Sequence, residues 1–260
     1  MDTLAGYDWG AVALALSISM LAGLSTGVGG VFVALKSAPS NRFLAGALGF
    51  SSGVMVYISL VEMLPEAAEQ VGEWPAVAAF FGGVGVIALI DWLVPEEVNP
   101  HEEHDSTNAP NLARAGALTA VAIALHNFPE GFASFMSALA DPVLAAPIAL
   151  AIAIHNIPEG IAVAAPLREA TGRRWRAAGW ATLSGLAEPA GALVGFLLLL
   201  PFLGPSTLGL SFAAVAGIMV FISFDKLLPS AIHTGHHHHS VYGVVAGMAV
   251  MALSLALLPG

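Results

Sequence analysis

The sequence predicts an all-α integral membrane protein of eight transmembrane helices with an internal inverted repeat. Three observations lead to this prediction: long apolar runs, basic residues confined to one side, and two internal repeats. Hydrophobic residues make up 57% of the 260 positions and charged residues only 10%, whereas an ordinary soluble domain is about 25% charged. A soluble core could use many of these apolar residues, but not in runs this long.

Eight apolar runs are each long enough for a spanning helix, which needs about 20 mainly apolar residues. Only helices and closed barrels satisfy their backbone in lipid, and these runs do not alternate as barrel strands of about 10 residues would. Residues 1–260 are therefore predicted to form a single transmembrane domain, with loops at about 95–111 and 229–239 that the basic residues described next predict to be cytoplasmic. The predicted spans are 11–35, 43–64, 75–94, 112–139, 143–167, 176–200, 208–228 and 240–258.

The basic residues predict the orientation, because Lys and Arg mark cytoplasmic loops. All eight fall on one side of the eight-span arrangement: Lys36, Arg42, Arg114, Arg168, Arg173, Arg174, Arg176 and Lys226. Both termini are therefore expected outside the cytoplasm, in a protein of the cell (inner) membrane. The opposite side carries seven acids, Asp2, Asp8, Glu62, Glu66, Glu69, Glu73 and Asp141. Such a surface attracts cations, although acids are tolerated on either side; no nucleic-acid partner is expected.

Two internal repeats give the chain its predicted symmetry. Residues 53–67 (GVMVYISLVEMLPEA) and 217–231 (GIMVFISFDKLLPSA) are identical at eight of fifteen positions. These segments would cross the membrane in opposite directions, which predicts an inverted repeat of spans 1–3 and 6–8 around spans 4–5. This architecture is typical of secondary transporters and places the substrate near the membrane midplane.

The second repeat carries the candidate chemistry. Residues 124–133 read ALHNFPEGFA and residues 153–162 read AIHNIPEGIA. His126 and Glu130 are four residues apart and share one helix face, as do His155 and Glu159. The proline of each motif removes a backbone hydrogen-bond donor, and the glycine that follows Glu allows another helix to approach closely.

Three glutamates lie deep in apolar spans without a basic residue at the same depth. They are Glu130, Glu159 and Glu188. Ionised carboxylates are costly there unless they are protonated or hold a cation. Together with two imidazoles and two amide oxygens they form a nitrogen and oxygen ligand set suited to zinc, iron, copper, nickel and manganese. The set exceeds the four ligands of a usual zinc site, which predicts two metals that share carboxylates.

These motifs resemble those of the ZIP family of zinc/iron permeases, particularly its bacterial members. The resemblance rests on HNFPEG at 126–131, HNIPEG at 155–160, SGLAEPAG at 184–191 and GFSSGVM at 49–55, and it covers nearly the whole chain. It implies eight spans with outward termini, dimerisation, and import of zinc, with iron, manganese, cobalt and cadmium as further candidates. It also implies the metal ligands His126, Asn127, Glu130, His155, Asn156, Glu159 and Glu188, assisted by Met55.

The chain departs from the family pattern at two positions. Asn156 stands where some relatives have Asp, which lowers the negative charge at one metal position. Lys226 stands where many bacterial relatives have an acid, which argues against a metal site at the inner end of span 7.

The sequence leaves open the role of two histidine-rich segments and two other functions. HEEHD at 101–105, and His233 with HHHH at 236–239, could receive metal that leaves the pore or could be solvated linkers. The same buried ligands could serve a zinc-dependent intramembrane hydrolase, or the glutamates a proton-coupled carrier of an organic cation. The inverted repeat and the mid-membrane depth of every ligand favour a transporter, for which no catalytic cofactor is expected.

Overall fold

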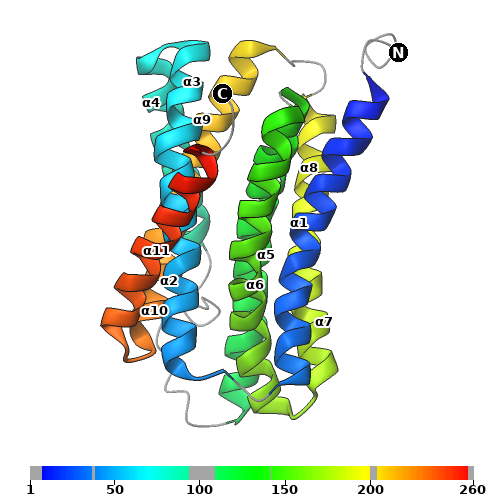
Figure 1. Cartoon of the computed structure of the whole chain (residues 1–260), viewed down its shortest axis with the longest axis vertical. Helices are drawn as coiled ribbons and strands as arrows, with labels where there is room; N and C mark the ends of the chain where they lie inside the picture. The colour runs from blue at the N-terminus through cyan, green and yellow to red at the C-terminus, as the bar shows by residue number, and fades with distance from the viewer. Residues whose placement is uncertain (1–7, 37–38, 94–108, 141, 200–203, 257–260) are drawn as a thin grey trace.

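The chain folds into a bundle of long helices, seen in a computed structural model (Figure 1). The structure describes residues 8–36, 39–93, 109–140, 142–199 and 204–256, without some side chains of α5 and α6. The described residues contain no strand. The helices are α1 (Trp9–Leu35), α2 (Asn41–Ile58), α3 (Leu64–Val71), α4 (Glu73–Leu93), α5 (Ala109–Ala140), α6 (Pro142–Thr171), α7 (Arg174–Gly185), α8 (Ala187–Leu199), α9 (Pro205–Ile222), α10 (Leu228–His233) and α11 (His237–Ala256), with π-helical turns η2 (Ser59–Met63) and η4 (Ser223–Leu227).

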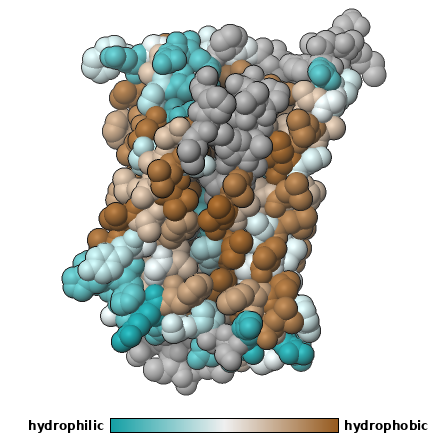
Figure 2. Space-filling model, viewed as in Figure 1, coloured by the Kyte–Doolittle hydropathy of each residue, from teal (hydrophilic) through white to brown (hydrophobic). Residues whose placement is uncertain are grey.

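Six helical stretches of the described residues are long and apolar enough to cross a membrane. Figure 2 shows hydrophobic side chains over the middle of the bundle and hydrophilic ones toward its two ends. The six stretches are Trp9–Leu35, Asn41–Val71, Glu73–Trp92, Arg174–Leu198, Ser206–His233 and His237–Ala256. Helices α5 and α6 lie alongside them and are 32 and 30 residues long.

The first internal repeat contains the same helix irregularity twice. The Leu64 N–H bonds to the Ser59 carbonyl, and at the matching position the Leu228 N–H bonds to the Ser223 carbonyl. Each is a bond over five residues, which defines a π-helical turn. A proline follows at once in both segments and lacks the N–H that a regular α-helix would use. The widened turn lets the helix continue past the proline.

This irregularity corrects two predicted helix ends. Spans 2 and 7 were expected to end at residues 64 and 228, close to their prolines, whereas helical structure continues to Val71 and His233. The expected loop at about 229–239 is consequently reduced to residues 234–236, since α11 begins at His237. Gly235, with φ of +80°, supplies the left-handed turn that this short connection requires. The other expected loop falls on residues 94–108, which lie outside the described part of the chain.

Span 6 is also more irregular than its predicted single helix over 176–200. It consists of α7 and α8, which are interrupted at Leu186. Pro189 has no N–H to offer the Gly185 carbonyl four residues earlier, which weakens the helix at this point. Spans 4 and 5, in contrast, continue as helices through Pro129 and Pro158.

The helices form two groups that stand side by side in Figure 1. Helices α1, α5, α6, α7 and α8 pack on one another, and α2, α3, α4, α9, α10 and α11 form the second group. Helix α3 packs on α9 while α10 packs on α2, so the two copies of the first repeat run in opposite directions. The main contacts between the groups are α2 with α6 and α5 with α9.

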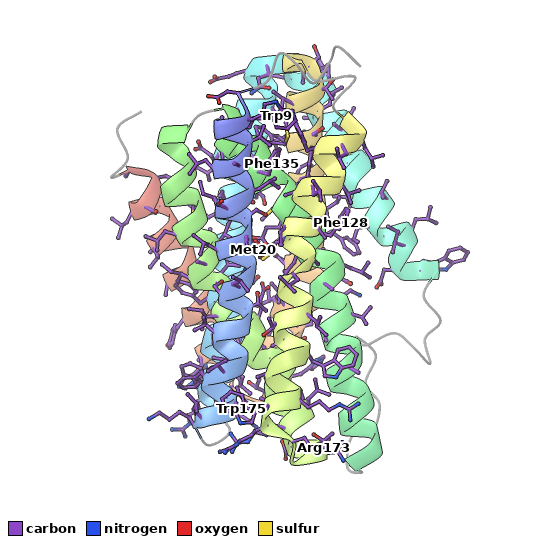
Figure 3. The ribbon with its side chains drawn as sticks, turned by 90° about the vertical axis from the view of Figure 1, so that its right-hand side faces the viewer. Trp9, Met20, Phe128, Phe135, Arg173 and Trp175 are labelled. Atoms are coloured by element: carbon purple, nitrogen blue, oxygen red, sulfur yellow. The ribbon has the colours of Figure 1, made fainter. Side chains whose placement is uncertain are left out.

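The two ends of the bundle differ in charge. Figure 3 places Trp9, at the start of α1, at one end, and Arg173 and Trp175 at the other. The last turn of α6, with Arg168, and the first turn of α2, with Arg42, also lie at this second end. Helix α3, with Glu66 and Glu69, lies at the same end as Trp9.

Candidate metal centre

Three helices of the first group bring the predicted ligands together inside the bundle. Asn127 and Glu130 come from α5, His155 with Asn156 and Glu159 from α6, and Glu188 from the first turn of α8. Each of these six side chains is at most 1% exposed. The carboxylate of Glu188 lies within electrostatic range of both Glu130 and Glu159. The structure therefore buries three acids close to one another.

Glycines allow the backbones of these helices to approach closely. A Cβ atom on Gly131 would lie 2.0 Å from the Glu188 carbonyl oxygen, and one on Gly160 would lie 1.8 Å from the Thr26 carbonyl oxygen. Both distances are far inside van der Waals contact, so only glycine fits. The sequence interpretation of these two glycines as close-approach positions is confirmed.

The histidine and glutamate of different motifs meet across the α5–α6 contact. His155 Nε2 lies 2.7 Å from Glu130 Oε1. Spacing along one helix predicted that His155 and Glu159 share a face, but it did not predict which motif the imidazole contacts on the neighbouring helix. The packing of α5 against α6 determines that the two HNxPEG motifs form one site.

Both asparagines are oriented by backbone carbonyls that only accept hydrogen bonds. Asn127 Nδ2 donates to the Ser184 carbonyl over 3.3 Å, beside the interruption between α7 and α8. Asn156 Nδ2 donates to the Ala22 carbonyl over 3.1 Å and also to the Glu188 carboxylate. The amide nitrogens must face these acceptors, which leaves each Oδ1 on the opposite side.

Three oxygen atoms of the cluster have no hydrogen-bond partner among the described residues. They are Asn127 Oδ1, Asn156 Oδ1 and Glu188 Oε2. Buried polar atoms in folded proteins are nearly always satisfied, so atoms without a partner are informative. Amide and carboxylate oxygens are ligands for divalent cations, and the chemistry of these atoms fits a bound metal.

Ser51 is a site residue that the sequence interpretation missed. This serine of α2 is fully buried, and its hydroxyl donates to Glu159 Oε1 over 2.8 Å. It brings the second helix group into the site. The signal available in the sequence was its position four residues before Met55, which places both side chains on one face of the helix.

The structure does not link Met55 to this network and does not describe the side chain of His126. Met55 is fully buried on α2 and belongs to the apolar core; its role as a ligand stays a prediction. His126 lies in α5, but its side chain is outside the described part of the structure. Among the described side chains, no three from His, Cys, Asp and Glu converge tightly enough to hold a metal alone. Amide oxygens and His126 belong to the predicted set as well.

An apolar helical bundle with a buried, acid-rich cluster of nitrogen and oxygen ligands defines a class of protein, a membrane transporter for cations. Intramembrane carboxylates are costly and therefore mark ion pathways. The cluster lies where helices of both groups meet, as substrate sites of transporters with internal repeats do.

Comparison with known proteins identifies the family. A family model described as ZIP zinc transporter matches residues 93–255. Proteins named zinc transporter ZupT from Corynebacterium efficiens, Corynebacterium glutamicum and Streptococcus mutans are 59%, 58% and 49% identical to this chain. The alignments cover 96%, 94% and 94% of this chain and 99%, 98% and 97% of the relatives.

The chain belongs to the ZIP family of zinc transporters and is a divalent metal transporter with several membrane-spanning helices. The predicted family and the predicted metal transport are confirmed. The comparisons give no support to the alternative of a zinc-dependent hydrolase.

Proposed function

We propose that this chain carries zinc into the cytoplasm through the buried cluster of α5, α6 and α8. The ligands in this proposal are His126, Asn127, Glu130, His155, Asn156, Glu159 and Glu188, with Met55 on α2 in an assisting position. The observation that carries the proposal is the set of buried amide and carboxylate oxygens without hydrogen-bond partners among the described residues. The zinc specificity is supported by the names of the relatives.

The number and type of ligands support two metal ions that share carboxylates. A usual zinc site has four ligands, and this cluster offers more. Iron, manganese, cobalt and cadmium suit nitrogen and oxygen ligands as well, so they are further candidate substrates.

The proposed topology has eight spanning helices in the cell (inner) membrane, with both termini outside the cytoplasm. Helices α5 and α6 would be the two spans beyond the six apolar stretches, and residues 1–260 would form a single domain. Spans 1–3 and 6–8 would be inverted repeats around spans 4–5. The matching π-helical turns and the opposite directions of the two repeat copies support this arrangement. A homodimer is proposed from the family resemblance alone.

Zinc uptake into proteoliposomes that contain the purified chain tests the proposal. We expect uptake by the wild-type chain and its loss in Glu130→Ala and Glu159→Ala. Glu69→Ala is the matched control, because Glu69 is an exposed residue of α3. Wild-type uptake rates in either of the first two variants, with normal insertion, would reject the assigned site. A panel of other divalent ions, with and without a pH gradient, would define specificity and energy coupling.

A further inference from the structure

A pair of histidines at the α10–α11 turn has a spacing that suits a second metal site, separate from the cluster inside the bundle. His236 immediately precedes α11 and His239 lies in its first turn, three residues later. Residues three apart share one face of a helix. Their rings meet edge-on at an angle of 85°, with centroids 5.7 Å apart. Two imidazoles bound to one zinc ion through 2.0–2.1 Å bonds place their centroids about 5–6 Å apart.

The protonation pattern of His236 fits a metal ligand. Its Nδ1 atom lies 3.0 Å from the Thr234 carbonyl oxygen. A carbonyl oxygen only accepts, so Nδ1 carries the proton and Nε2 presents its lone pair. Histidines that bind metals typically donate their second ring nitrogen to a carbonyl or carboxylate in this way, which holds the ring in orientation.

The backbone that carries the pair is held in place. The N–H groups of His239 and Ser240 both bond to the His236 carbonyl, over 2.9 and 3.2 Å. Ser240 is fully buried, and its carbonyl lies 2.2 Å from where a Cβ on Gly49 of α2 would be. A backbone packed this closely fixes the distance between the two imidazoles before a metal arrives.

The two intervening histidines serve a different contact. The ring of His238 stacks on Tyr242 with centroids 6.2 Å apart, and His237 packs edge-on against His238 at 5.6 Å. Their positions on the helix differ from those of His236 and His239 by about 100° per residue. Centroid distances are similar in the two pairs, so what distinguishes them is the carbonyl contact of His236 and the stacking of His238 on Tyr242.

We propose that His236 and His239 bind a divalent metal ion at the basic end of the bundle, with water completing the coordination shell. Two protein ligands at the positive end of the α11 dipole make this a weak, rapidly exchanging site. Its use as an acceptor for transported metal rests on the proposed function, because that function delivers metal to this end of the protein.

Zinc binding to the purified full-length chain tests the proposal, measured by equilibrium dialysis in a Glu130→Ala background that disables the internal cluster. We expect this chain to retain one weakly bound zinc. The double variant His236→Gln/His239→Gln should weaken that binding by at least about tenfold. The matched control His237→Gln/His238→Gln removes the same number of imidazoles and should leave the affinity for this zinc unchanged. Zinc should also protect His236 and His239, but not His237, from carbethoxylation detected by mass spectrometry.

Several results would overturn the proposal. Equal losses in the two double variants would show unspecific binding to a histidine-rich surface, and no loss in either would show that the pair binds no metal. Failure of the proposed function is a separate result, since it would appear as undiminished zinc uptake by the Glu130→Ala chain.

Discussion

At the scale of single residues, hydrogen bonds from neighbouring helices hold the proposed ligands in orientation. The Ser51 hydroxyl donates to Glu159, and carbonyls of Ala22 and Ser184 orient the two asparagines. Partners of this kind align a ligand before the metal binds, and their loss typically lowers metal affinity by about 10- to 100-fold.

We therefore expect Ser51→Ala to weaken zinc binding by about tenfold, because it removes a donor that holds the Glu159 carboxylate. Ser51→Thr keeps the hydroxyl and should restore most of the affinity. The control is Ser52→Ala, since the Ser52 hydroxyl bonds to the Ser223 carbonyl and not to the cluster. Calorimetric zinc titration would measure all three. Equal effects of Ser51→Ala and Ser52→Ala would indicate a general packing defect.

The site should also bind metal more weakly in acid. Only neutral imidazole and ionised carboxylate act as ligands, so protons compete with the metal, and imidazole in water titrates near pH 6.5. We expect apparent zinc affinity to fall from pH 7 to about pH 5. Glu130→Gln should weaken binding. It should also reduce this pH dependence, because it removes one carboxylate for which protons and the metal compete.

Zinc titrations of the purified protein at several pH values would measure the effect. The control is Glu69→Gln, which changes an exposed acid of α3 and should leave the pH dependence of zinc affinity unchanged. An affinity that stays constant over this pH range would exclude a site built from these histidines and glutamates.

At the scale of secondary-structure elements, close helix approach positions the ligands. Gly131 lies against the backbone of Glu188, and Gly160 lies against that of Thr26. A backbone atom cannot rotate away as the end of a side chain can. Any larger residue must therefore separate the helices that share the site.

Gly131→Ala should destabilise the protein by about 2 kcal/mol, within the range of overpacked cores, and should reduce zinc affinity as α5 and α8 move apart. Thermal unfolding in detergent and zinc titration would measure the two effects. The control is Gly179→Ala in α7, where a Cβ atom meets nothing within 4 Å. That change should be neutral or stabilising by about 0.5–1 kcal/mol, because it replaces a helical glycine. Similar behaviour of the two variants would contradict this account of helix approach.

At the scale of the whole molecule, the two ends of the bundle predict its orientation. Acidic residues of α3 lie at one end and basic residues such as Arg173 lie at the other. Basic segments stay in the cytoplasm during insertion. We therefore expect the end with α3 to face outward.

Single cysteines would test this orientation, and the chain suits the method because it contains no cysteine. A membrane-impermeant maleimide should label Glu69→Cys on intact cells, whereas it should label Arg173→Cys only after lysis. Both positions are exposed, so accessibility within the protein does not explain a difference. Labelling of Arg173→Cys alone on intact cells would reverse the topology.

The sequence by itself determined the helical membrane class and the family, and it predicted the ligands proposed here apart from the supporting Ser51. Hydropathy, helical spacing and the repeated HNxPEG motif are local properties, and they can be read without knowing which helices touch. The predictions of Gly131 and Gly160 as close-approach positions are confirmed for the same reason. The ends of spans 2 and 7 were predicted too early, at residues 64 and 228, because a π-helical turn carries each helix past its proline.

Only the tertiary structure decided which elements become neighbours. It separates spans that are adjacent in sequence, such as α1 and α2, into different helix groups. It also brings Ser51 to Glu159, 108 residues away, and His155 to Glu130. The spacing of residues along one helix shows which side chains share a face. It does not show which helix covers that face, because the neighbour depends on how all helices pack together.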